Sequence, residues 1–437
     1  MNTLQQLRAG ELAGCRRLKL SCGLTEFPME ILALAETLEI LDLSGNALST
    51  LPDELLQLHR LRILFCSDNA FTELPAILGR CRQLEMIGFK ANRIARVPAA
   101  ALPPRLRWLV LTDNRIGELP PEIGCCRRLQ KLMLAGNRLT ALPAELAACT
   151  RLELLRIAAN RLTMLPEWLF SLPRLAWLAY AGNPLGENLA AAPAIESIAW
   201  HHLQLSATLG EGASGVIHRA AWQCAGEAQP VAVKLFKGAL TSDGLPKHEM
   251  HACIHAGAHP NLIPVIGRIE GHPEQVDGLV MALIEPAYRN LAGPPSLDSC
   301  TRDVYSATTR FPVAVALRLA HGIAGAARHL HEQGIVHGDL YAHNILHLDD
   351  GAALLGDFGA ASPIDPGNEA QALALQRIEV RAFACLLEEL VERCTPLPDN
   401  ADTLATLRAL QVRCASENIG ERPLFAEIES RLRALAA

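Results

Sequence analysis

The chain has 437 residues, of which 50% are hydrophobic and 20% are charged, so we expect a folded protein of two or three domains. Its formal net charge of −6 gives no electrostatic reason to expect nucleic acid or an anionic membrane surface as a partner. The 13 cysteines lack the paired spacing of a disulfide framework, and no apolar run is long enough for a signal peptide or a membrane-spanning helix. We therefore expect reduced thiols, no membrane segment and a cytoplasmic location.

A repeat of about 23 residues fills the first 185 residues of the chain. The motif LDLSGNALSTLP at 41–52 returns every 23 residues, except for one step of 22, and an earlier copy carries Cys22 in place of its asparagine. The pattern LxxLxLxxNxLxxLP resembles the leucine-rich repeat family. This resemblance implies an α/β horseshoe solenoid of about eight repeats over residues 1–185, in which the asparagine side chains bind backbone groups rather than a ligand. These asparagines are Asn46, Asn69, Asn92, Asn114, Asn137, Asn160 and Asn183.

The strand positions that alternate with the leucines should face solvent on the concave side of the solenoid. Many of them are apolar, and a contiguous exposed apolar strip usually marks an interface with tryptophan and methionine as favoured anchors. We therefore expect Phe65, Trp108, Met133 and Trp177 to bind a protein partner. Docking of the strip on the chain's own second domain and an error of one residue in the strand register remain alternatives. The strip comprises Ile40, Ile63, Phe65, Met86, Trp108, Val110, Met133, Leu154 and Trp177.

The repeat stops where alanine, proline and glycine become frequent, so we assign residues 186–202 to a linker. The next segment is rich in predicted strands, which surround the glycine loop LGEGASGVIHRA and continue into VAVKLF. Gly210, Gly212 and Gly215 have the GxGxxG spacing, and Lys234 lies on the strand after next. A glycine loop alone is weak evidence for nucleotide binding.

Five further motifs follow this loop along the chain. Together with it they resemble a eukaryotic-type serine/threonine protein kinase domain, over residues 203–437. The resemblance implies a bilobal α+β domain that uses ATP and Mg²⁺, so we expect a leucine-rich-repeat solenoid followed by a protein kinase-like domain. The motifs are HEMHACIHAGAHPN at 248–261, GLVMALIEP at 278–286, HGDLYAHNIL at 337–346, GDFG at 356–359 and GERPLFAEI at 420–428.

The resemblance assigns catalytic roles to five side chains. Lys234 would hold the α- and β-phosphates, and Glu249 would fix the position of Lys234. Asn344 and Asp357 carry oxygen atoms suited to Mg²⁺. Asp339 would accept or orient the proton of the acceptor hydroxyl.

The same resemblance predicts the nucleotide site. The glycines would let the loop lie close to the phosphates, apolar side chains would sandwich the adenine, and Met281 would stand at the gatekeeper position. Ordinary core packing explains the apolar residues equally well, and the two interpretations are compatible. The predicted cofactor-binding residues are Leu209, Gly210, Gly212, Gly215, Ile217, Ala232, Lys234, Met281, Leu283 and Leu346.

The sequence departs from the family pattern around the catalytic loop. Gly338 replaces the arginine that normally receives a phosphorylated activation loop, and Tyr341 replaces a lysine whose role His343 could partly fill. EVRAFACLLEELV, the next large predicted helix, begins only 22 positions after Asp357, and Ser362 is the one hydroxyl-bearing residue between them. We therefore expect an activity that does not depend on phosphorylation of the activation loop.

These features favour ATP- and Mg²⁺-dependent phosphotransfer to serine or threonine hydroxyls of protein substrates, with the repeats recruiting a protein partner. Two alternatives remain open. HGD with a short activation segment also resembles aminoglycoside and choline phosphotransferases, which phosphorylate small alcohols. A nucleotide-binding but inactive scaffold is the other alternative, although the chain keeps the full catalytic set.

Overall fold

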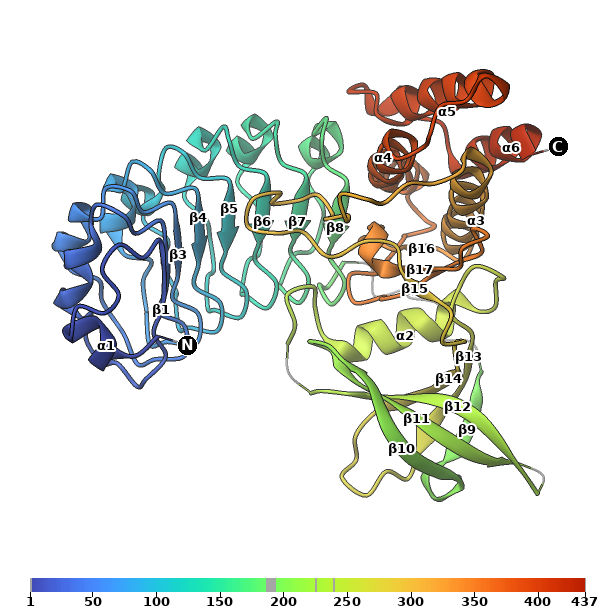
Figure 1. The fold of residues 1–437 in the computed structure, drawn as a ribbon, viewed down its shortest axis with the longest axis horizontal. Helices are drawn as coiled ribbons and strands as arrows, with labels where there is room; N and C mark the ends of the chain where they lie inside the picture. Colours follow the sequence, from blue (N-terminus) through green and yellow to red (C-terminus); the bar gives the residue numbers. More distant parts are fainter. Residues whose placement is uncertain (1, 186–193, 225, 239, 437) are drawn as a thin grey trace. The chain divides into compact units, whose positions relative to one another are not determined.

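The computed structural model describes residues 2–185, 194–224, 226–238 and 240–436 (Figure 1). Contacts between residues divide the chain into two units. The repeat unit holds the residues up to Arg174 together with Asn183–Leu185. The second unit holds Leu175–Gly182 and the described residues after 193. The part of the expected linker at 186–193 lies outside the described residues.

The repeats form short strands in one parallel sheet, in the order β1 to β8. The central residue of each strand is a buried leucine or isoleucine, so each repeat adds one layer to a shared core. This sheet confirms the predicted leucine-rich-repeat solenoid. The strands are β1 (Arg17–Lys19), β2 (Ile40–Asp42), β3 (Ile63–Phe65), β4 (Met86–Gly88), β5 (Trp108–Val110), β6 (Lys131–Met133), β7 (Leu154–Arg156) and β8 (Trp177–Ala179).

Short helices connect the strands of the repeat unit. A five-residue helix, α1 (Leu4–Arg8), begins the chain, and each later connection contains a 3₁₀ helix that directly follows a proline. Proline has a fixed φ and no N–H group, so it ends the extended segment without leaving a strand donor unpaired. These helices are η1 (Met29–Leu34), η2 (Asp53–Gln57), η3 (Ala76–Arg80), η4 (Ala99–Ala101), η5 (Pro121–Cys125), η6 (Ala144–Ala148) and η7 (Glu167–Ser171).

The repeated asparagines satisfy buried backbone groups, as expected. Asn114 shows the pattern, because its Nδ2 donates to the carbonyls of Leu111 at 3.0 Å and Phe89 at 2.9 Å. Its Oδ1 accepts a hydrogen bond from the backbone N–H of Ile94 at 2.9 Å. Since these partners are backbone atoms of its own repeat and of the preceding one, the ladder is structural.

The predicted apolar strip is wrong at two of its four anchors. Trp177 is only 1% exposed and Met133 only 7% exposed, so neither is an exposed side chain. Three further members of the strip are also buried, namely Ile63, Met86 and Leu154. Alternation along a strand assigns a side chain to a face, but it does not reveal what covers that face. Phe65 and Trp108 remain partly exposed, with ring centroids 6.2 Å apart, and the Lys131 amine lies 4.4 Å from the Trp108 ring centroid.

The second unit begins with a six-stranded sheet in the order β10-β11-β12-β14-β13-β9. Helix α2 (Pro246–Ala256) lies along this sheet (Figure 1), and its Met250 and Ile254 pack on Phe236 and Leu279. Strand β9 comes from the segment assigned to the linker and pairs in parallel with β13. The strands are β9 (Glu196–Ala199), β10 (Leu203–Glu211), β11 (Gly215–Cys224), β12 (Glu227–Phe236), β13 (Val265–Glu270) and β14 (Gly278–Ala282), and η8 (Trp200–His202) follows β9.

The rest of the second unit is mostly helical, which agrees with the predicted bilobal α+β class. Helices α4 and α6 pack on the alanine-rich α3, and α5 packs on α4. The helices are α3 (Val313–Glu332), α4 (Glu369–Glu392), α5 (Ala401–Cys414) and α6 (Phe425–Ala436), with η9 (Ala342–Asn344), η10 (Pro398–Asn400) and η11 (Ile419–Glu421). The strands are β15 (Arg289–Asn290), β16 (Ile335–Val336), β17 (Ile345–His347), β18 (Ala353–Leu355) and β19 (Ser362–Pro363).

Helix α4 begins earlier than the sequence predicted. It starts at Glu369, because the Asn368 side chain accepts a hydrogen bond from the Gln371 N–H and caps the helix. The activation segment, defined here as residues 357–368, is therefore shorter than expected. None of the helices in the described part of the chain combines the length and the hydrophobicity of a membrane span.

Candidate active site

The glycine loop connects β10 to β11 and is closed by a hydrogen bond from the Gly212 N–H to the Gly215 carbonyl, at 2.9 Å. A Cβ atom at Gly215 would lie 2.5 Å from the Leu235 carbonyl oxygen, so only glycine allows the loop to pack this closely on β12. A Cβ atom at Gly210 or Gly212 would meet no atom of the described residues within 4 Å. The loop is therefore fixed at one end and has open space beside its first two glycines.

Lys234 on β12 and Glu249 on α2 form a buried ion pair. The Lys234 side chain is 13% exposed and the Glu249 side chain 2% exposed. Burial lowers the pKa of Lys234, but the neighbouring carboxylate of Glu249 outweighs burial and raises this pKa above its usual value. Lys234 is thus a fixed cation, and the negative charge of Asp357 favours its protonated form further.

The predicted catalytic loop, residues 337–345 and called the catalytic loop below, runs from the end of β16 to the start of β17. The Asn344 Nδ2 donates to both the Oδ2 and the backbone carbonyl of Asp339, at 2.8 and 2.9 Å. These bonds use the amide nitrogen, which leaves the Oδ1 of Asn344 for another partner. His337 accepts from the Asp339 N–H at 3.3 Å and hydrogen-bonds the Gly356 carbonyl at 2.9 Å, so it ties the loop to the residue before Asp357.

Asp357 has an exposed side chain and a left-handed backbone, with φ of 56°. Its Oδ1 accepts a hydrogen bond from the Gly359 N–H at 3.1 Å. Phe358 is buried, and its ring centroid lies 5.2 Å from that of His337. Burial of Phe358 against the catalytic loop therefore fixes the backbone from which the Asp357 carboxylate projects.

Glu379 on α4 is a functional candidate that the sequence analysis missed. Its Oε1 accepts a hydrogen bond from the Gly338 N–H at 2.7 Å, and its Oε2 lies 2.7 Å from the Nε2 of His331. Burial raises the pKa of Glu379, but the hydrogen bond and charge of His331 outweigh burial and lower it. A lone glutamate among the apolar residues of EVRAFACLL was the available signal.

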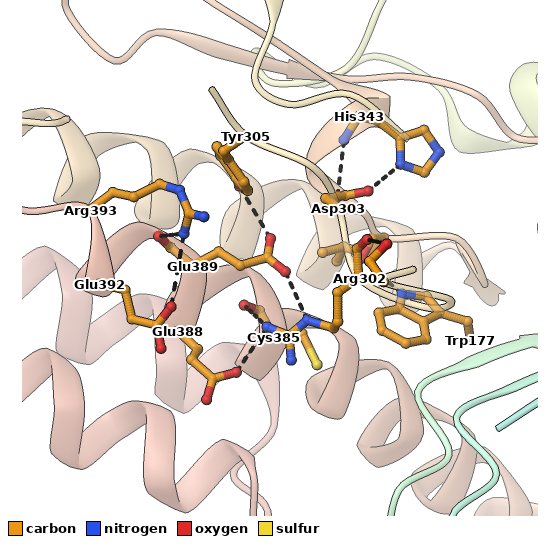
Figure 2. Close-up of polar contacts among 12 residues, drawn as sticks. Trp177, Arg302, Asp303, Tyr305, His343, Cys385, Glu388, Glu389, Glu392 and Arg393 are labelled. Atoms are coloured by element: carbon orange, nitrogen blue, oxygen red, sulfur yellow. Dashed lines mark hydrogen bonds and ion pairs between the residues drawn. The ribbon is translucent and has the colours of Figure 1, made fainter. Parts of the chain in front are cut away.

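Asp303 is a second missed residue, and it holds His343 of the catalytic loop. Figure 2 shows the Oδ1 of Asp303 bonded to the His343 Nδ1 at 2.7 Å and its Oδ2 accepting from the His343 N–H at 3.2 Å. Arg302 fixes the same segment to α4 through Glu388 at 2.9 Å and Glu389 at 3.0 Å. Asp303 stands in a segment without a predicted element, so no sequence pattern pointed to this pair.

The predicted adenine-binding residues come from two sheets. Strand register places Ile217 opposite Lys234, and Ala232 opposite Met281. Leu283 follows β14. Leu209 on β10 is 52% exposed, and Leu346 lies on β17 in the separate sheet β15-β17-β18.

Comparison with known proteins gives matches in both units. Residues 203–385 match the family described as protein tyrosine and serine/threonine kinase. Residues 127–185, 37–58 and 105–126 match leucine-rich repeat families. A solved structure of a leucine-rich repeat protein from Leptospira interrogans aligns with a TM-score of 0.36 and 27% identity, over 42% of this chain and 53% of that chain.

The curated relatives that this chain is similar to include two protein kinases. Serine/threonine-protein kinase mos of Xenopus laevis is 25% identical over 176 residues, which cover 40% of this chain and 46% of the relative. Non-receptor tyrosine-protein kinase TNK1 of Mus musculus is 27% identical over 164 residues, which cover 36% of this chain and 22% of the relative. The chain therefore spans less than half the length of these relatives.

Proposed function

Because the chain combines leucine-rich repeats with a protein kinase domain, we propose that it transfers the γ-phosphoryl group of ATP to serine or threonine hydroxyls of a protein substrate. The buried Lys234–Glu249 pair is the observation that supports this most strongly. Placing a lysine and a glutamate from different elements out of water is costly, because each charge loses its hydration. Such a buried charged pair therefore often marks a functional site. A phosphate group explains the need for a cation at this point.

The described residues fit a nucleotide with its magnesium ion. The open space beside Gly210 and Gly212 leaves room for phosphates, and Lys234 supplies the positive charge. The Oδ1 of Asn344 and the exposed carboxylate of Asp357 are oxygen donors of the kind that Mg²⁺ prefers. Bound Mg²⁺ and ATP would supply the phosphoryl group and neutralise its charge.

The remaining catalytic work falls to Asp339. Asn344 holds the Asp339 carboxylate through its Oδ2, so this carboxylate is oriented before a substrate arrives. We propose that Asp339 accepts the proton of the acceptor hydroxyl. We also propose that His343, which Asp303 holds in place, donates a hydrogen bond to the transferred phosphoryl group. His343 would thereby fill part of the role of the lysine that Tyr341 replaces.

Transfer to tyrosine is the second candidate. One relative is a serine/threonine kinase and another a tyrosine kinase, so similarity supports both acceptors. The retained Lys234, Glu249 and Asp339 argue against an inactive scaffold.

We expect the full chain to transfer labelled phosphate from ATP to protein serine or threonine when Mg²⁺ is present, and to lose this activity when EDTA removes the metal. The assay contains a mixed protein substrate, added aminoglycosides and amino alcohols, followed by phosphoamino-acid analysis. The control is Lys234→Met, which removes the proposed phosphate-binding cation. Label only on phosphotyrosine would move the assignment to the second candidate. Label only on small alcohols, or none with intact ATP binding, would overturn protein phosphotransfer.

We also propose that the aromatic pair Phe65–Trp108 of the repeat unit binds a protein partner. Partly exposed aromatic rings beside a lysine combine apolar area with a polar rim, which is typical of interaction hot spots. Gly88 makes this arrangement possible, because a Cβ atom there would lie 2.4 Å from the Phe65 ring.

Trp108→Ala should weaken capture of a partner from cell extract at least tenfold, because truncation of a hot-spot side chain costs about 2 kcal/mol of binding free energy. ATP binding should be unchanged. Trp168→Ala is the matched control, because Trp168 is a partly exposed tryptophan on the 3₁₀ helix η7 rather than on a strand. Equal loss in both variants, or none in either, would remove the proposal for this surface.

A further inference from the structure

The segment Leu175–Gly182, which we call the clasp segment, has a repeat sequence but belongs by its contacts to the second unit. It contains β8, and its two largest side chains, Trp177 and Tyr180, are 1% and 3% exposed. Buried aromatic side chains at the edge of a repeat array need a partner surface. In the second unit, that surface is formed by the elements that carry the proposed catalytic residues.

Trp177 contacts the catalytic loop directly. Its indole ring stacks on the Tyr341 ring, with centroids 4.1 Å apart and planes only 8° from parallel. Its Nε1 donates a hydrogen bond to the backbone carbonyl of Leu340 at 3.1 Å. Leu340 directly follows Asp339, so Trp177 fixes the backbone on which the catalytic carboxylate stands.

Tyr180 and Ala181 hold the activation segment. Their backbone N–H groups donate to the Oγ of Ser362 at 2.9 and 3.2 Å, and Ser362 in turn lies 3.2 Å from the Ala360 carbonyl. The Tyr180 hydroxyl donates to the Pro363 carbonyl at 2.5 Å. The one hydroxyl-bearing residue of the activation segment is therefore buried and engaged in a structural junction.

The clasp segment also approaches the catalytic loop and α2 through glycines. A Cβ atom at Gly338 would lie 2.7 Å from the Leu178 carbonyl oxygen, and one at Gly182 would lie 2.3 Å from the His248 ring. His248 on α2 directly precedes Glu249. The segment thus contacts three elements, each of which carries a member of the proposed catalytic set.

We propose that Trp177 and Tyr180 are positioning residues, and that the clasp segment orders the catalytic loop and the activation segment of this kinase domain. This order replaces the link between a phosphorylated activation loop and the loop arginine, a link that Gly338 and the short activation segment make impossible here. The proposal rests on the proposed function for its catalytic consequence. Its structural part is independent of whether phosphate is transferred.

Hydrogen exchange measured by mass spectrometry on the full chain tests the structural part. We expect Trp177→Ala to raise exchange in residues 337–345 and 357–368 roughly tenfold, because a stacked ring and a hydrogen bond are lost. Strands β10–β12 and the repeats before residue 150 should be unchanged. Trp168→Ala, in η7, is the matched control and should alter neither loop.

Kinetics test the catalytic part. Trp177→Ala should lower kcat roughly tenfold while the KM for ATP stays within about twofold, since the Lys234 cation and the glycine loop remain. Trp177→Phe keeps the stacked ring without the donor and should restore part of kcat. A variant that merely unfolded would lose ATP binding along with kcat.

Two smaller changes keep the proposal falsifiable if Trp177→Ala does not fold. Tyr180→Phe removes only the hydroxyl bonded to Pro363. Ser362→Ala removes only the Oγ, which accepts from the Tyr180 and Ala181 N–H groups and donates to the Ala360 carbonyl. Each should raise exchange in residues 357–368 about fivefold. Unchanged exchange in both loops for all folded variants would overturn the clasp. Raised exchange in the variants, together with no transfer activity of the wild-type chain, would overturn only the proposed function.

Discussion

Asp339→Asn is expected to lower kcat for phosphotransfer by about 10²- to 10⁴-fold, the range typical for loss of a general base. The free energy of unfolding should change by less than about 1 kcal/mol, because an amide oxygen at this position still accepts the hydrogen bond from Asn344. The substitution thus removes a proton acceptor and keeps the local hydrogen bond. Steady-state kinetics and chemical denaturation of the same preparation measure both quantities.

Asp349→Asn is the matched control for this prediction. Asp349 lies in the exposed turn after β17 and pairs with Arg289, so it has the same side chain a few residues from the loop. Its loss should leave kcat unchanged and cost little stability, as exposed ion pairs usually do. If Asp339→Asn retained more than about a tenth of kcat, the proton-accepting role would be untenable.

The periodic and motif-based features of this protein were predictable from sequence. Each repeat must bury one layer of the same core, so the solenoid is visible in the sequence as a 23-residue period. Recognising this period requires no knowledge of contacts between distant residues. Lys234 and Glu249 were paired on the resemblance alone, and the structure brings them together. Their elements follow each other closely along the chain, so local topology is enough to place them.

Contacts between distant segments were not predictable in this way. Trp177 was assigned to an exposed face, yet its indole bonds a carbonyl 163 positions later in the chain. Asp303 and Glu379 likewise act on the catalytic loop from elements far from it in sequence. Alternation and helical spacing describe one element at a time, so they cannot report which other element covers a given side chain.

Gly338 illustrates how a sequence comparison can give the right residue and the wrong reason. By sequence alone, Gly338 stands where an arginine is expected, with a consequence only for regulation. In the structure its φ is 72°, and a Cβ atom would lie 2.6 Å from the Ala360 carbonyl oxygen and 2.7 Å from that of Leu178. The position therefore requires glycine because two backbone segments close around it.

Gly338→Ala should consequently destabilise the second unit by about 2–5 kcal/mol. About 1–2 kcal/mol comes from the left-handed backbone and about 1–3 kcal/mol from the collision with the two carbonyls. Gly334→Ala is a control with the same φ of 72°, where the nearest atom to the added Cβ is 3.9 Å away. Gly334→Ala should therefore lower the free energy of unfolding only by the about 1–2 kcal/mol that the left-handed backbone costs.

The difference in unfolding free energy between the two variants measures the cost of the collision alone, and thus the close approach of the clasp segment and the activation segment to the catalytic loop. Chemical denaturation of both variants beside the wild-type chain measures it as a difference of about 1–3 kcal/mol. Equal costs would mean that the backbone around Gly338 relaxes freely, and the steric explanation would fail. A larger cost at Gly338 also predicts that an arginine at this position, in Gly338→Arg, impairs this protein, because the space an arginine needs is already filled by Leu178 and Ala360.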